Sequence, residues 1–166
     1  MAQVLWLVLG LTTIVSGVLA SHHPKALKVG RGALGSLMLI GGAVVNAIYL
    51  GSGVNYDDFA DLSMLAFVTD TWRELVAPNQ GFFIGLLIAF EAFAGVLVYV
   101  GGRAAVAGMA AILGFHIGLM FFGWGFWIWS IPMIVGVALL LRAQLRDATH
   151  TTRTPARQMS AVPVTL

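Results

Sequence analysis

The sequence predicts an all-α protein, a polytopic membrane helix bundle with about five transmembrane helices. Of its 166 residues, 59% are hydrophobic and only 10% are charged, and the mean hydropathy of the chain is +0.91. A soluble domain carries roughly a quarter charged residues, so this chain has too few charges to cover a water-facing surface. The apolar residues also gather in runs close to the length of about 20 residues that a membrane-spanning helix needs.

Five apolar runs appear when the chain is divided at its charged and turn-forming residues. The expected spans are residues 4–20, 33–51, 81–100, 104–122 and 126–141. The first run has no basic region before it, so we expect a retained helix and not a signal peptide. The stretch between Arg103 and Arg142 carries no Asp, Glu, Lys or Arg and is too long for one span. We expect it to turn near Gly123 and Gly125, because glycine permits the backbone of a tight turn.

The positive charges indicate an orientation. With five spans, all of the following fall on one side: Lys25, Lys28, Arg31, Arg103, Arg142, Arg146, Arg153 and Arg157. Lysine and arginine are enriched in cytoplasmic loops, so this side is expected to be cytoplasmic. The sequence therefore predicts a multi-pass protein of the cell membrane, with its N-terminus outside and its C-terminus in the cytoplasm.

The long connection of residues 52–79 is the main external segment. It contains five acidic residues, and its apolar residues lie three or four positions apart. This pattern predicts a short amphipathic helix on the membrane surface, capped by Asp57 or Asp58. A second helix is expected from a capping box at Thr71 to Pro78. Residues 1–146 would form one bundle domain, and the polar residues 147–166 a disordered cytoplasmic tail.

Glu91 is the most informative residue of the chain. An ionisable group near the middle of a span is costly to bury and usually faces the interior of the bundle. His116 is its expected partner, since Glu91 lies 12 residues before Arg103 and His116 lies 13 residues after it. Both side chains should therefore reach a similar depth, where an ion pair or hydrogen bond would join them. Asn46 is expected about one helical turn nearer the outside.

Two interpretations of this polar cluster stay open. The hydroxyl groups of Thr12, Thr13 and Ser16 in the first span are expected to join it. Paired polar residues often only hold membrane helices together, which is the structural interpretation. The functional interpretation is a proton-linked, ligand-binding or quinone site, because intramembrane ionisable groups are by default functional candidates.

The remaining motifs indicate packing more than chemistry. Ala110, Gly114 and Gly118 form a stripe of small residues that is expected to face a neighbouring helix. The three tryptophans within residues 124–129 are typical of an interfacial aromatic belt.

No metal site and no nucleic-acid binding are expected. The chain has no cysteine, and the adjacent His22 and His23 have no third ligand at a useful spacing. The external aspartates lack the spacing of a calcium-binding EF-hand loop. The formal net charge is only +2, and the basic residues are scattered between apolar runs.

Two segments resemble the DoxX-like family of small bacterial membrane proteins. Residues 31–35, Arg-Gly-Ala-Leu-Gly, with the glycines at 41 and 42, resemble the opening helix of that family. Residues 91–95, Glu-Ala-Phe-Ala-Gly, with the Gly-Gly-Arg of residues 101–103, resemble its second helix. The four-helix core of the family would map onto residues 31–141, with the first span as an additional N-terminal helix. The last two spans also resemble the end of the HTTM membrane domain of vitamin-K-dependent carboxylase relatives.

The DoxX-like resemblance implies an accessory subunit of a membrane redox or quinone-linked system, with quinone as the implied cofactor and a membrane redox protein as the implied partner. One alternative is a non-catalytic scaffold that binds a partner through a surface made of Asp57, Asp58, Asp61 and Trp72. Another is a small transporter or lipid-binding protein with a cavity at the depth of Glu91. The sequence assigns no enzymatic reaction, and an oligomer is compatible with it.

Overall fold

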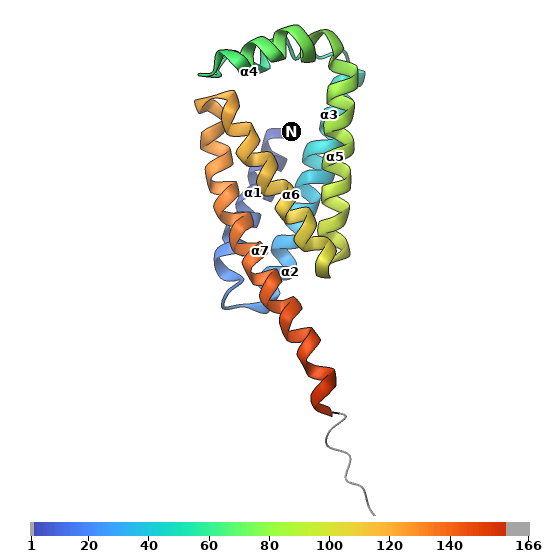
Figure 1. The fold of residues 1–166 in the computed structure, drawn as a ribbon, viewed down its shortest axis with the longest axis vertical. Helices are drawn as coiled ribbons and strands as arrows, with labels where there is room; N and C mark the ends of the chain where they lie inside the picture. The colour runs from blue at the N-terminus through green and yellow to red at the C-terminus, as the bar shows by residue number, and fades with distance from the viewer. Residues whose placement is uncertain (1, 159–166) are drawn as a thin grey trace, which may run out of the picture.

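The computed structural model describes the backbone of residues 2–158 and the side chains of residues 3–147. This part of the chain is almost entirely helical and contains no strand, which confirms the all-α bundle. Figure 1 shows long helices standing side by side, with the helical segment around α4 lying across one end of the bundle.

The chain order of the long helices follows the expected spans. The first is α1 (Ala2–Leu19). The second is one continuous helical stretch made of α2 (Pro24–Ser36), the π-helix η1 (Leu37–Val44) and α3 (Val45–Gly51). The remaining long helices are α5 (Gln80–Val100), α6 (Gly102–Leu119), which ends in the 3-10 turn η5 (Met120–Phe122), and α7 (Trp124–Gln158). Four stretches are long and apolar enough to cross a membrane: Pro24–Gly51, Ala66–Val100, Gly102–Phe122 and Trp124–Asp147. The apolar part of α1, Gln3–Leu19, is shorter, and it packs along α2 and α7 within the bundle.

Two helix boundaries differ from the sequence prediction. The second helix begins at Pro24 and not near residue 33, because proline fits the first turn of a helix. At the other end of the chain, α7 continues as a helix to Gln158, so residues 147–158 are not the expected disordered tail. Residues such as Ala143, Gln144 and Arg146 favour helix, and they extend α7 beyond the apolar span. Residues 159–166 of the predicted tail lie outside the described residues.

Glycines allow α1 and α7 to touch along their backbones. A Cβ atom added to Gly17 would lie 2.3 Å from the carbonyl oxygen of Gly136, which no real side chain tolerates. A Cβ on Gly136 would in turn lie 2.8 Å from the Cα of Ile14. Small residues that admit such close approach are common between membrane helices.

The prediction that the stripe of Ala110, Gly114 and Gly118 packs against a neighbouring helix is wrong. A Cβ atom added to Gly114 or Gly118 would have no other part of the described chain within 4 Å, and Ala110 is exposed. The packed face of α6 contains instead Gly108, Ile112 and His116, whose spacing keeps them on one side of the helix. The buried histidine thus marks the inner face of α6, and the small-residue stripe lies away from it.

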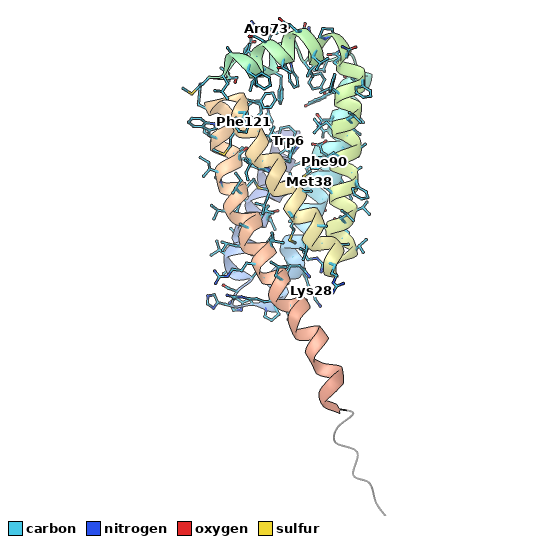
Figure 2. All side chains as sticks on the ribbon, viewed as in Figure 1. Trp6, Lys28, Met38, Arg73, Phe90 and Phe121 are labelled. Atoms are coloured by element: carbon cyan, nitrogen blue, oxygen red, sulfur yellow. The ribbon has the colours of Figure 1, made fainter. Side chains whose placement is uncertain are left out.

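The two ends of the bundle carry opposite charges. The turn between α1 and α2 and the turn between α5 and α6 lie at the end opposite to α4 (Figure 1), where Lys28 is also found (Figure 2). Lys25 and Arg103 belong to the first turns of α2 and α6, which begin at these two turns. At this end Arg31 donates from Nε to the carbonyl oxygen of Val98 at 3.2 Å and from Nη2 to that of Tyr99 at 3.1 Å. The guanidinium group therefore caps the C-terminus of α5, where a positive charge is favourable.

Residues 52–79 form a helical cover over the other end, and we call this segment the roof. It contains the 3-10 turn η2 (Asp57–Ala60), α4 (Ala66–Thr71), the π-helix η3 (Trp72–Val76) and the 3-10 turn η4 (Ala77–Asn79). The helix expected to start at Asp57 or Asp58 is only this one 3-10 turn, and the α-helix begins at Ala66. Thr71 lies within a continuing helix and does not cap a new one. Pro78 does not end the helix, because it occupies the first turn of η4, where proline is tolerated.

The roof is anchored to the turn between α6 and α7. Ser63 donates from Oγ to the carbonyl oxygen of Phe121 at 2.7 Å. Gly123, at the predicted turn, has a φ of +111°, and a Cβ there would lie 1.9 Å from the carbonyl oxygen of Leu62. Glycine is needed at this position both for its backbone conformation and for the contact with the roof.

We expect Gly123→Ala to lower the free energy of unfolding by about 1–3 kcal/mol, because the substitution forces an unfavourable φ and a clash with Leu62. Gly114→Ala is the matched control, since open space surrounds Gly114 and alanine favours helix. Thermal unfolding in detergent gives the melting temperatures of both variants. Equal melting temperatures for the two variants would contradict this account of the turn.

Candidate functional site

A cavity of about 620 Å³ lies under the roof, between the roof-side halves of the long helices. Ligand cavities in proteins typically measure about 300–1,000 Å³ and combine apolar walls with a few polar groups. Trp6 of α1 and Met38 of η1 line this cavity (Figure 2), and Trp6 is also 37% exposed. The size of the cavity fits a small ligand.

Aromatic side chains form the upper wall of the cavity. Phe59 of the roof stacks on Trp72, with ring centroids 5.0 Å apart, and its ring is also 5.0 Å from that of Phe126 of α7. Trp72 meets Phe122 edge to face at 5.4 Å. Since the cluster joins the roof to the α6–α7 turn, it stabilises the closed arrangement of the cavity.

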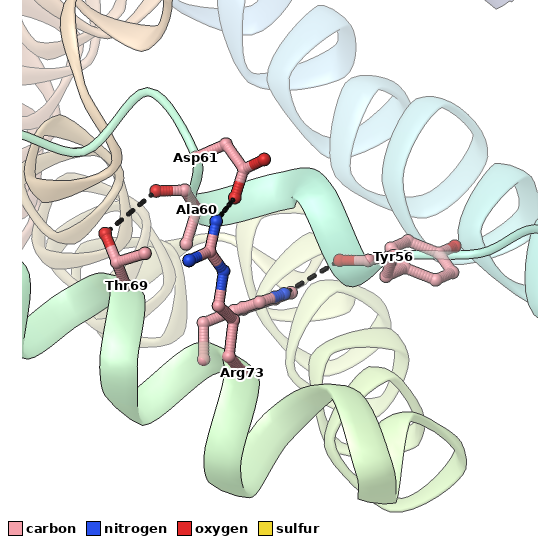
Figure 3. A network of polar contacts seen from close by, with 6 residues as sticks. Tyr56, Ala60, Asp61, Thr69 and Arg73 are labelled. Atoms are coloured by element: carbon pink, nitrogen blue, oxygen red, sulfur yellow. Dashed lines mark hydrogen bonds and ion pairs between the residues drawn. The ribbon is translucent and has the colours of Figure 1, made fainter.

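Hydrogen bonds hold the roof together (Figure 3). Trp72 donates from Nε1 to the carbonyl oxygen of Tyr56 at 2.7 Å, and Thr69 donates from Oγ1 to that of Ala60 at 3.3 Å. Arg73 pairs with Asp61 at 2.7 Å, but both side chains are exposed, so this ion pair adds little stability.

Only part of the expected partner surface is exposed. Asp57, Asp58 and Asp61 are exposed, although Asp61 is already paired with Arg73. Trp72 lines the cavity instead, because its ring stacks on Phe59 and its indole nitrogen is bonded within the roof. Trp129 likewise faces the cavity, whereas Trp124 and Trp127 are exposed on the outside of α7.

Glu91 lies at the polar floor of the cavity and is only 5% exposed. Asn46 of α3 donates from Nδ2 to Glu91 Oε2 at 2.9 Å, so the two residues predicted to share a cluster do meet. A Cβ on Gly42 would lie 2.6 Å from Glu91 Oε1. The carboxyl group therefore packs directly against the backbone of η1, where only glycine leaves room.

The π-helix η1 shapes this floor. π-helical turns are rare and are frequently found at functional sites. Trp6 donates from Nε1 to the carbonyl oxygen of Gly41, so α1 is bonded to η1 beside the carboxyl group. Trp6, Gly42 and Tyr56 are cavity residues that the sequence analysis did not identify as part of the site. The glycine pair at 41 and 42 was the available signal, because it marks close approach next to Asn46.

His116 lines the same cavity at 3% exposure, but its expected pairing with Glu91 is wrong. Its Nδ1 is hydrogen-bonded to the carbonyl oxygen of Ile112 at 2.9 Å, and no ion pair joins it to Glu91. A carbonyl oxygen can only accept, so Nδ1 carries the proton and Nε2 is left as an acceptor when the ring is neutral. Both residues line the same cavity, but Glu91 is bonded to Asn46 and His116 to the carbonyl oxygen of Ile112.

The hydroxyl groups of the first span do not join the polar cluster. Thr12 and Thr13 donate to the carbonyl oxygens of Val8 and Leu9 in their own helix, at 2.7 and 2.8 Å. Neither threonine lines the cavity, nor does Ser16. The threonine hydroxyls are satisfied four residues back along α1, as is common in membrane helices.

Within residues 3–147, no three histidine, aspartate or glutamate side chains lie close enough to hold a metal ion. No protein-family model, curated protein or solved structure matches this chain.

We expect Asn46→Ala to lower the free energy of unfolding by about 1–3 kcal/mol, because the buried Glu91 carboxyl group loses its partner. Asn79→Ala is the matched control, since Asn79 makes a similar hydrogen bond, to Leu75, at an exposed position. The double variant Asn46→Leu/Glu91→Leu should recover most of the loss, because removing both polar partners removes the unmet hydrogen bond. A loss in Asn46→Ala no larger than in Asn79→Ala would contradict the pairing.

Proposed function

We propose that this multi-pass membrane protein binds a ring-bearing, largely apolar ligand of the quinone type in the cavity under the roof. In this proposal it is an accessory subunit of a membrane redox or quinone-linked system. The observation that carries the proposal is the combination, in one cavity, of aromatic walls with the buried acid Glu91 and the histidine His116.

The wall and the floor offer different interactions to such a ligand. Rings such as those of Phe59, Trp72 and Phe115 can stack on a planar head group. Glu91 Oε1 accepts no hydrogen bond from the described chain and lies at the cavity floor, as does His116 Nε2. These atoms can accept hydrogen bonds from a hydroxyl group, and a protonated Glu91 or His116 can donate to a carbonyl oxygen.

The chain offers no cysteine pair to carry electrons. In a redox role the electrons would therefore travel on the ligand, and the protein would supply binding, exclusion of water and proton exchange at the floor. The resemblance of residues 31–35 and 91–95 to the DoxX-like family supports the same proposal, since members of that family are linked to quinone-dependent systems.

Lipid binding or transport is the second candidate, because it also needs a cavity at the depth of Glu91. It differs from the first proposal in the ligand, which would be an acyl chain and not a ring. The scaffold alternative has less support, since Trp72 of the expected partner surface lines the cavity and stacks on Phe59.

We expect a decyl-substituted benzoquinone to quench tryptophan fluorescence in a saturable way, because Trp6, Trp72 and Trp129 line the cavity. Decanol, which has the alkyl chain without the ring, should neither quench the tryptophan fluorescence nor compete with the quinone. A quinone oxygen can only accept, so the donor is a protonated Glu91. Glu91→Leu, which has no donor, should weaken quinone binding about 3- to 10-fold, the effect of one net hydrogen bond.

Glu74→Leu is the control for this titration, since Glu74 is an exposed acid outside the cavity. Unsaturable quenching would contradict the proposal, as would the same affinity in both leucine variants. Effective competition by decanol would favour the acyl-chain alternative.

We further propose that the roof lies outside a bacterial inner membrane and that the end bearing Lys25 and Arg103 lies in the cytoplasm. The sorting of acidic and basic residues to opposite ends of the bundle supports this orientation. The chain lacks cysteine, so single cysteines can be introduced without background.

In intact cells, an impermeant maleimide should label Asp58→Cys and leave Lys25→Cys unlabelled. Both positions are exposed in the structure, so access to the reagent depends only on the side of the membrane. The reverse pattern of labelling would overturn the orientation.

A further inference from the structure

The helices α5 and α6 pack closely in the halves that lie away from the roof. A Cβ atom added to Gly108 of α6 would lie 2.9 Å from the carbonyl oxygen of Ala94 and 3.0 Å from Leu97 of α5. Nearer the roof, the rings of Phe90 and Phe115 still meet, with centroids 5.4 Å apart. Figure 1 shows that α6 then leaves α5, so the two helices reach the roof at separate places.

The register of this contact identifies the residues at which the helices separate. Residues three, four and seven apart share one face of a helix, and antiparallel neighbours pair in opposite order. Beyond Phe90 and Phe115, the positions that follow on the same two faces are Leu87 and Phe83 of α5 and Leu119 and Phe122 of α6. All four line the cavity.

The aromatic residues at this level have partners on their own sides. Phe122 meets Trp72 of the roof at 5.4 Å and Phe126 of α7 at 6.0 Å, measured between ring centroids. Phe83 meets the ring of its neighbour Phe82 at 5.2 Å. The space between α5 and α6, from the Phe90–Phe115 contact up to the roof, is therefore a side of the cavity, and we call it the opening.

The other neighbouring helices are joined at the level of the cavity. Asn46 is bonded to Glu91, which joins α3 to α5. Trp6 is bonded to the backbone of η1, which joins that helix to α1. A Cβ on Gly10 would lie 2.1 Å from the ring of Trp129, so α1 also packs directly on α7. The 3-10 turn η5 connects α6 to α7.

The two ends of the cavity are covered as well. The roof lies across one end and is held there by its ring contacts and by the bond from Ser63 to the backbone of Phe121. At the other end, Met109, Ile112 and Val137 have no exposed surface and belong to the apolar core of the bundle. The opening between α5 and α6 is thus the side of the cavity with the fewest contacts across it.

The opening lies within the apolar part of both helices. Phe83 and Leu87 follow the first residue of α5 by three and seven residues, which places them about 5–11 Å below its roof end. The hydrocarbon core of a bilayer is about 30 Å thick, so this level lies inside it. Leu86 of α5 is exposed beside the opening, and α6 carries no Asp, Glu, Lys or Arg after Arg103. A rim of this kind faces lipid.

We propose that the ligand enters and leaves the cavity sideways, from the lipid bilayer, through the opening between α5 and α6. The ligand class is then restricted to compounds that dissolve in the bilayer, and the membrane itself is their source. This inference rests on the proposed function of the cavity and adds the route by which the ligand reaches it.

Gly118 is the position at which the route can be obstructed. It lies next to Leu119 on α6, and a Cβ there has no other part of the described chain within 4 Å, so a larger side chain disturbs no packing. The variants are Gly118→Ala, Gly118→Leu and Gly118→Phe. Gly85→Phe is the matched control, because Gly85 has the same open space but lies two residues from Leu87, on the opposite face of α5.

The test measures the rates of quinone binding to the protein in lipid nanodiscs. Stopped-flow quenching of tryptophan fluorescence by the decyl-substituted benzoquinone gives the association rate, and a chase with quinone-free vesicles gives the dissociation rate. An obstacle on the route raises the barrier equally in both directions, so both rates fall by one factor and Kd stays the same. We expect Gly118→Phe to slow both rates about 3- to 10-fold, with Gly118→Leu in between. Gly118→Ala and Gly85→Phe should change them less than about twofold.

Equal rates in Gly118→Phe and Gly85→Phe would overturn the inference and leave the proposed function standing. A weaker Kd in Gly118→Phe with an unchanged association rate would also overturn it, because the side chain would then act on the bound ligand. If Gly118→Phe lowers the melting temperature, Gly118→Leu decides by the same comparison. Failure of the unmodified protein to bind the quinone would overturn the proposed function and the inference together.

Discussion

The hydrogen bond between Asn46 and Glu91 is the interaction on which the cavity depends. A carboxyl group inside a membrane protein is costly unless a partner satisfies it. Asn46 supplies that partner at 2.9 Å and ties α3 to α5. The same carboxyl group lies against Gly42, so the π-helical turn of η1 and its glycines bring the second helical stretch close enough for the bond. Glu91 Oε2 then accepts a hydrogen bond from Asn46, and Oε1 has no hydrogen-bond partner in the described chain.

The roof covers the cavity that this buried acid lines. Phe59 and Trp72 of the roof pack with Phe122 and Phe126, and the carbonyl oxygen of Leu62 lies against Gly123. The roof therefore covers the site and joins it to the turn between α6 and α7.

The sequence predicted the architecture well and the partners within the site less well. Hydropathy and the sorting of charges predicted the order of the helices, the turn at Gly123 and the helical external segment. Helical rise alone placed Glu91 and His116 at one depth, and both do line the cavity. Their pairing was wrong because rise carries no information on side-chain direction: His116 turns to the carbonyl oxygen of Ile112, and Asn46 reaches Glu91. Tyr56 was missed as a cavity residue because its position depends on how the roof folds back over the bundle, which no local pattern in residues 52–79 indicates.

The central claim is that Glu91 is a carboxyl group in an apolar cavity to which a ring-bearing ligand binds. Dicyclohexylcarbodiimide reacts with carboxyl groups in apolar surroundings, so its covalent attachment, located by mass spectrometry of peptides, measures this directly. The account predicts modification at Glu91 but not at the exposed Asp57 or Glu74, and protection of Glu91 by the decyl-substituted benzoquinone. A Glu91 that stays unmodified, or one modified equally with and without the quinone, would contradict it.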